Sequence, residues 1–115
     1  MDKIKEEISW STFEQVDLRV GTIIRTEMFS EARKPAYKIW VDLGSLGVKK
    51  SSAQVTKHYA LEELVGKQVV CIVNFGEKQI GPFLSQVLIS GFADEYGDVI
   101  LTTVDKKVPD GAKLF

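Results

Sequence analysis

The sequence predicts an all-β protein: a five-stranded barrel with a helix between strands 3 and 4 and a short N-terminal helix. Three observations predict this class. With 115 residues, the chain is long enough for one domain with one core and too short for two ordinary domains. Its 44% hydrophobic and 27% charged residues are typical of a globular protein. Most of its apolar stretches alternate with polar residues, as half-buried strands do.

The first strand is expected at residues 18–29, where Leu18, Val20, Thr22 and Ile24 fall on one face. Gly21 on the other face suggests a bend or bulge that curls the strand. Residues 48–55 are unusually polar, which indicates either an exposed edge or a ligand face. Residues 68–75 are apolar on both faces and are expected to form the central strand. The remaining strands are expected at residues 37–43, 84–92 and 98–104.

Three short helical segments are expected. Residues 1–10 place Ile4 and Ile8 one turn apart, and Ser11 with Glu14 fits a capping box for a turn over residues 12–16. Residues 58–65 should form the helix of the barrel, ended by Gly66. This order of elements matches the OB-fold, a partly open barrel that often binds nucleic acids on one face.

The net charge of −1 predicts no nucleic-acid partner by itself, but the charges are unevenly distributed. Residues 32–57 carry six basic side chains and one acidic side chain, whereas the rest of the chain is acidic. A basic binding face explains this cluster, and so does a solvated face that gathers charges by chance.

Several function classes are disfavoured. No apolar run is long enough to span a membrane, and the first residues lack a secretion signal, so we expect a cytoplasmic protein without membrane insertion. Cys71 lies in an apolar run and is expected to be a buried thiol. Because His58 and Cys71 are the only residues of their types, we expect no catalytic residue, no metal site and no cofactor. Glu62 and Glu63 are neighbours on a helix and do not face each other as a catalytic pair would.

Three segments carry a family resemblance: residues 13–23 (FEQVDLRVGTI), residues 31–38 with 49–54 (EARKPAYK and KKSSAQ), and residues 74–75 with 78–88 (NF and KQIGPFLSQVL). Together they resemble the CsaA-type members of the tRNA-binding-domain family, and the likeness extends to the final GAKLF. Gly76-Glu77 stands where the family often has two prolines, and Leu88 replaces a methionine of the general pattern. The resemblance implies one OB-fold domain over residues 1–115, a homodimer, tRNA binding, and a role in binding unfolded preproteins before export.

The candidate RNA-binding residues are cationic or polar and flank the expected binding face of the barrel. Basic side chains bind phosphates, and amides and hydroxyls read sugars or base edges. The set is Arg33, Lys34, Lys49, Lys50, Ser51, Asn74, Lys78, Gln79 and Ser85. Ordinary surface and turn polarity would explain the same residues.

A second candidate surface is aromatic and consists of Phe29, Trp40, Phe75 and Phe83. These side chains could stack on bases, line a groove for unfolded peptide, be covered by a partner, or simply pack in the core. The nearby acids Glu27, Glu31 and Glu77 could meet the positive charge of a precursor's signal region.

A homodimer is expected from apolar residues at the two termini, because chain ends are seldom so hydrophobic. The interface would use the helical extension over residues 1–16 and the tail over residues 105–115, with Ile4, Ile8, Trp10, Leu114 and Phe115. The sequence thus leaves open an RNA-binding module with a chaperone role, a purely protein-binding export chaperone, and a dimer with neither ligand.

Overall fold

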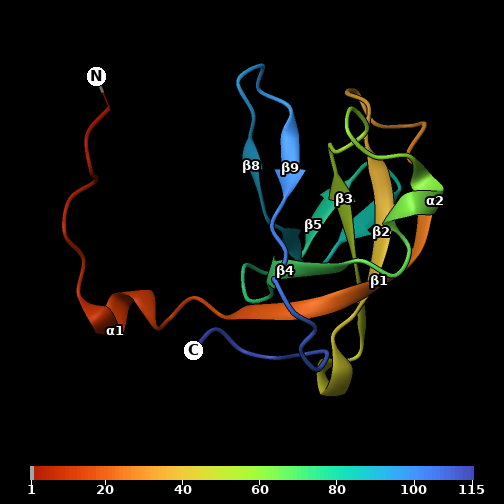
Figure 1. The fold of residues 1–115 in the computed structure, drawn as a ribbon. Coiled ribbons are helices and arrows are strands. Elements are labelled where there is room, and N and C mark those ends of the chain that lie inside the picture. Colours follow the sequence, from red (N-terminus) through yellow and green to blue (C-terminus); the bar gives the residue numbers. More distant parts are fainter. Residues whose placement is uncertain (1) are drawn as a thin grey trace.

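The main sheet has five strands in the order β3-β2-β1-β4-β7, each antiparallel to its neighbours (Figure 1). The structure is a computed structural model, and it describes residues 2–115. The strands are β1 (Leu18–Met28), β2 (Tyr37–Asp42), β3 (Val48–Ala53), β4 (Gln68–Ile72) and β7 (Leu88–Ile89). The sequence predicted β4 as the central strand. β4 is indeed paired on both sides, but the middle strand of the order is β1.

The sheet closes into a barrel because the segment around residues 85–86 returns to the edge of β3. The backbone N–H of Ser52 donates to Ser85 Oγ at 3.2 Å, and that of Gln86 donates to the carbonyl of Lys50 at 2.7 Å. The Lys50 N–H donates in turn to Gln86 Oε1 at 3.1 Å. The polar third strand is therefore an edge whose hydrogen bonds are satisfied by another part of the chain, and the predicted all-β barrel is confirmed.

Two hairpins extend the barrel. β5 (Lys78–Ile80) and β6 (Phe83–Ser85) pair within a region expected to be mostly loop. β8 (Gly91–Ala93) and β9 (Val99–Leu101) form a second hairpin that projects beyond the sheet (Figure 1). The expected strand at residues 84–92 is thus divided among β6, β7 and β8, because these segments pair in turn with β5, β4 and β9. The expected strand at residues 98–104 is shortened to β9.

The helix between the third and fourth strands is α2 (Leu61–Leu64), shorter than the expected residues 58–65. It begins late because the side chain of Glu63 accepts a hydrogen bond from the N–H of Ala60 at 2.6 Å, which caps the helix there. Gly66 follows the helix with φ of +96°, the left-handed conformation expected of a C′ glycine. A 3₁₀ turn, η1 (Gly44–Leu46), connects β2 to β3.

The core is built mainly from the alternating residues of β2 and β4. Ile39, Val41, Val69 and Cys71 are fully buried, as the alternation of residues 37–43 predicts for β2. The first strand differs from the prediction: its register shifts between Ile23 and Arg25, so the bulge lies at Ile24 and not at Gly21. Ile23 lies opposite Val41 and is buried before the bulge. The extra residue leaves Ile24 46% exposed and pairs Arg25 with the outward-facing Trp40.

The expected helix over residues 1–10 is wrong for the part that is described, since residues 2–9 are not helical and lead away from the barrel (Figure 1). The helix here is α1 (Trp10–Phe13), and its cap is Ser9, whose Oγ accepts a hydrogen bond from the N–H of Thr12 at 3.1 Å. The expected turn over residues 12–16 thus begins earlier and has a different cap. Short helices are marginal in water, and Ile4 and Ile8 have no surface to pack on.

Burial raises the pKa of the Cys71 thiol to about 12. We therefore predict that a thiol reagent such as iodoacetamide leaves the folded protein unmodified near neutral pH and labels it fully once denaturant unfolds it. The unfolded state releases the thiol proton above about pH 9 while the folded state keeps it, so the free energy of unfolding should fall as pH rises from there. A Cys71→Ala variant should lack this part of the pH dependence; complete labelling of the native protein would contradict the prediction.

Candidate nucleic-acid interface

The outer side of the sheet carries a row of cationic and aromatic side chains across β1, β2 and β3. Trp40 is paired in register with Arg25 of β1 on one side and Lys50 of β3 on the other. The guanidinium carbon of Arg25 lies 4.4 Å from the centre of the Trp40 ring, and Arg25 also pairs with Glu27. The residues occupy one face because directly opposed residues of neighbouring strands project to the same side.

Phe83 of β6 packs onto this row and brings two lysines together. The ring of Phe83 meets Trp40 edge-on, with 6.0 Å between centroids. The Nζ atoms of Lys50 and Lys38 lie 5.1 and 5.6 Å from the centre of the Phe83 ring. We call Arg25, Lys38, Trp40, Lys50 and Phe83 the cation–aromatic face. Its ammonium and guanidinium groups can bind phosphates while their stems rest on apolar rings.

The expected aromatic surface is only partly an open surface. Phe29 and Phe83 are 3% and 5% exposed and form a second small core with Ala36, against which the half-buried Trp40 packs. Phe75 is exposed in the segment after β4. Three of the four predicted residues therefore gather in one cluster, but two of them are covered in the single chain, because the β5–β6 hairpin brings Phe83 onto Phe29.

The basic residues predicted to bind RNA do not share one face. Lys49 and Lys50 are neighbours in β3 and project to opposite faces, so only Lys50 joins the cation–aromatic face. Lys49 lines a recess of about 380 Å³ together with Asn74 and Glu77. Lys78 and Gln79 are exposed on β5, and Arg33 and Lys34 are exposed in the loop before β2.

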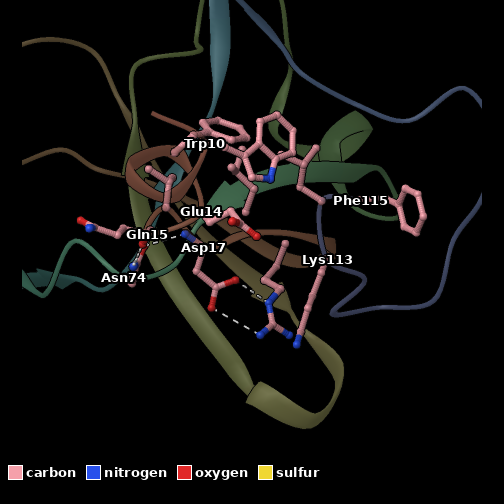
Figure 2. Close-up of a pocket in the computed structure, with 12 residues that line it drawn as sticks. Trp10, Glu14, Gln15, Asp17, Asn74, Lys113 and Phe115 are labelled. Carbon is pink, nitrogen blue, oxygen red and sulfur yellow. Dashed lines mark hydrogen bonds and ion pairs between the residues drawn. The ribbon is translucent and has the colours of Figure 1, made fainter. Parts of the chain in front are cut away.

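Three predicted polar residues are already engaged in holding the fold. Ser51 is buried, and its hydroxyl donates to the carbonyl of Ser52 at 3.3 Å. Ser85 accepts the barrel-closing hydrogen bond described above. Asn74 donates from its Nδ2 to the carbonyl of Gln15 at 2.7 Å and accepts from the N–H of Asp17 at 3.0 Å (Figure 2). These side chains position the elements around the face.

Sequence reasoning missed Arg25 and Lys38 as members of the face. Lys38 was visible as a polar residue beside Trp40 in the alternation of residues 37–43. Arg25 gave no such signal, because its side of the strand depends on the bulge at Ile24.

His58 is exposed, as expected, and its Nε2 lies 2.8 Å from Asp94 Oδ2. A hydrogen bond from the Asp98 N–H, followed by the one with His58, holds the pKa of the Asp94 carboxyl below its usual range. Among residues 2–115, His58, Asp94 and Asp98 are the one group whose possible metal-ligand atoms lie within 4.8 Å of one another. This group combines one histidine with two carboxylates, a set of ligand atoms that the counts of His and Cys residues do not reveal. Its visible structural role is to tie the tip of the β8–β9 hairpin to the segment before α2.

The terminal residues expected at a dimer interface are exposed, and three of them share a cavity of about 520 Å³. Figure 2 shows Trp10, Lys113 and Phe115 around this cavity, which Leu114 also lines. The tail is held beside β1, because the N–H of Leu114 donates to the carbonyl of Leu18 at 3.1 Å.

Arg19 fixes the polar side of the same cavity. Its Nε donates to Asp17 Oδ1 at 2.7 Å, and its Nη1 donates to the carbonyl of Gly111 at 3.2 Å. The arginine thereby connects the start of β1 to the C-terminal tail. Both α-helices of the described chain have four residues, and none of its helices has the length and apolar character of a membrane span.

Comparisons with known proteins agree with this architecture. The family model of the putative tRNA-binding domain matches residues 18–113. The methionine–tRNA ligase of Methanocaldococcus jannaschii is 35% identical over 109 residues, which are 95% of this chain and 16% of the ligase. The chain thus spans about one sixth of the length of that relative.

Two solved structures resemble the whole chain. The crystal structure of the chaperone CsaA from Bacillus anthracis str. Ames superposes with a TM-score of 0.90 at 43% identity and covers 96% of this chain and all of that one. The CsaA chaperone protein from Picrophilus torridus gives a TM-score of 0.88 at 41% identity, with 95% of this chain and 100% of that chain covered. The resemblance stated from the sequence is confirmed: the chain belongs to the tRNA-binding-domain family as a CsaA-type member.

Proposed function

We propose that this chain is a non-enzymatic protein that binds tRNA through the cation–aromatic face. The observation that carries the proposal is the gathering of Arg25, Lys38 and Lys50 around the rings of Trp40 and Phe83 on one side of the barrel. Membership of the tRNA-binding-domain family supports the choice of ligand.

Phosphate binding supplies most of the affinity in this proposal. Each cation that meets a phosphate releases a condensed counterion, which favours binding at low salt. The half-buried Trp40 offers ring surface on which an unpaired base can stack. Arg33 and Lys34 extend the basic surface from the neighbouring loop. Lys49 in its recess and Lys78 and Gln79 on β5 add further contacts to the RNA. Ser51, Asn74 and Ser85 act by positioning these elements.

Salt dependence tests this mechanism. If three cations each neutralise one phosphate, the logarithm of the tRNA association constant should fall with the logarithm of salt concentration with a slope of about −2 to −3. Fluorescence anisotropy of labelled tRNA between about 50 and 200 mM salt measures the slope. Affinity that does not change over this range would refute phosphate binding.

A second function is favoured by exposed apolar side chains beyond the cation–aromatic face, among them Trp10, Phe75 and Phe92. Such residues suit a chaperone that holds unfolded preproteins, and the two CsaA structures are of proteins described as chaperones. The alternative is an export chaperone that binds only protein. The same salt series separates the two activities, because apolar peptide binding is nearly indifferent to salt or slightly stronger in excluded salts. Because tRNA and preproteins that await export are both found in the cytoplasm, the proposal includes a cytoplasmic location.

We also propose that the chain acts as a homodimer through the terminal surfaces formed by residues 1–16 and 105–115. The support is the exposure of Trp10, Leu114 and Phe115 around a shared cavity, with Ile4 and Ile8 on the adjoining segment. A two-fold partner would bury these side chains on both copies at once.

A further inference from the structure

A histidine and two aspartates meet where the tip of the β8–β9 hairpin reaches the segment before α2. Asp94 and Asp98 flank the hairpin turn, and His58 belongs to the segment before α2. We call these three residues the His–Asp cluster. The Nε2 atom of His58 lies 2.8 Å from Asp94 Oδ2, and the possible ligand atoms of all three side chains lie within 4.8 Å of one another.

The hairpin turn fixes the direction of the Asp94 carboxylate. Its Oδ1 atom accepts hydrogen bonds from the backbone N–H groups of Tyr96 and Asp98, each at 2.9 Å. The Oδ2 atom is left to face His58. Carboxylates that ligate metals are themselves held by hydrogen bonds, which orient the remaining oxygen. One ligand atom of the cluster is therefore oriented by the backbone before any ion binds.

The negative charge of the cluster is not matched by a lysine or an arginine. Both aspartates are partly buried, and neither forms an ion pair with such a residue in the described chain. Asp98 takes part in the turn through its backbone and not through its carboxylate. Lys57 precedes His58 without pairing with either aspartate, and Glu95 adds a further negative charge. A divalent cation would compensate this charge, because both carboxylates can share it.

We propose that the His–Asp cluster binds one divalent transition-metal ion of the class that includes Zn²⁺. A neutral imidazole nitrogen and carboxylate oxygens bind Zn²⁺ at about 2.0–2.2 Å, so atoms that share one ion lie roughly 3–4 Å apart. Side-chain movements of about 1 Å bring the cluster to this spacing. The ligands would be His58 Nε2 and one oxygen from each aspartate, with water completing the coordination. Mg²⁺ and Ca²⁺ are not expected to compete, because both prefer sites built from oxygen alone.

The bound ion would attach the hairpin firmly to the rest of the chain. β8 and β9 form a two-stranded sheet of their own that projects beyond the main sheet (Figure 1). The contact of His58 with Asp94 is partly exposed, and an exposed pair of this kind contributes little to stability. An ion held by both segments replaces that contact with three bonds to one centre. The site shares no residue with the cation–aromatic face, and it replaces the expectation from the sequence that the chain has no metal site.

Isothermal titration of the untagged, metal-stripped protein with zinc chloride measures the binding, and one Zn²⁺ per chain is expected. His58→Gln and Asp98→Asn should each weaken binding by at least about tenfold, because even the loss of a residue that merely orients a ligand typically costs this much. The matched control is Glu95→Gln, which removes an exposed carboxylate from the same turn. Because its charge is screened, this variant should weaken binding by about threefold or less. Equal losses in all three variants, or no binding by the wild-type chain, would overturn the proposal.

The single histidine of the chain gives a second readout, which identifies the binding atom. In a long-range proton–nitrogen spectrum, Zn²⁺ should move the Nε2 signal of His58 strongly and the Nδ1 signal much less, while excess Mg²⁺ should move neither. With free Zn²⁺ at about ten times its dissociation constant, amide hydrogen exchange at Asp98 should slow by about tenfold, because the turn must release the ion before it opens. Zn²⁺ binding that leaves the His58 signals or this exchange rate unchanged would refute the site.

Discussion

The double variant Lys38→Gln/Lys50→Gln should bind tRNA about 10²-fold more weakly than the wild-type protein at low salt. Each substitution removes one hydrogen bond between a lysine and a phosphate, which is worth about 1.5 kcal/mol or somewhat more. Two such losses correspond to roughly a hundredfold fall in the association constant. The slope of affinity against salt should also become shallower by about two, one for each phosphate contact removed. Anisotropy titrations of both proteins at several salt concentrations measure the two quantities.

Glutamine is chosen because its stem can still cover the ring of Phe83, so the small core beneath the face is preserved. The matched control is Lys57→Gln/Lys67→Gln, which removes two exposed charges from positions outside both the face and the terminal segments. The control should keep affinity within about threefold, because distant exposed charges are screened. If both double variants lose affinity equally, binding depends on overall charge and the proposed face is wrong.

Replacing Gly21 with valine should destabilise the fold by about 3 kcal/mol or more, and the alanine variant should already show much of the loss. A Cβ atom at this position would lie 2.5 Å from Val41 Cγ1 and 2.7 Å from both Asp42 O and Leu43 Cδ2. One of these atoms belongs to the backbone of β2, so relief requires the two strands to separate. A loss of this size corresponds to a fall in melting temperature of roughly 10–20 °C.

Thermal unfolding followed by circular dichroism measures this effect. Gly76→Ala is the matched control, because Gly76 has φ of +82° and nothing within 4 Å of an added Cβ. It should cost only about 1 kcal/mol, the usual conformational penalty. If Gly21→Ala were no more harmful than Gly76→Ala, the close approach of β1 and β2 would not be what requires glycine at position 21.

Local patterns predicted the elements whose environment repeats along the chain. The alternation of residues 37–43 correctly placed Tyr37, Ile39, Val41 and Leu43 in the core, because β2 pairs with β3 in an unbroken register. Gly66 ended its helix as expected, because a C′ glycine acts through its own backbone. Because neighbouring residues of a strand point to opposite faces, the sequence also implied that Lys49 and Lys50 lie on different faces. The prediction that both residues share one RNA-binding face did not take this into account.

Patterns failed where one spacing fits two structures. The spacing of Ile4 and Ile8 fits one turn of a helix, and it equally fits one side of an extended segment. The helix does not form because the barrel offers these two side chains no surface on which to pack. The bulge in β1 was placed at Gly21 and lies at Ile24, because a register shift depends on the partner strand and not on the bulged strand alone.

The sequence by itself determined that this chain forms one antiparallel barrel of the tRNA-binding-domain family, because alternation, turn residues and family motifs are local properties. Only the tertiary structure decided which charged and aromatic residues share a surface. The β5–β6 hairpin brings Phe83 onto Phe29 and Trp40, and the bulge turns Arg25 toward the same ring. Such a surface forms from contacts between residues up to 54 positions apart in the sequence, as with Phe29 and Phe83, and these contacts exist only after the barrel has closed.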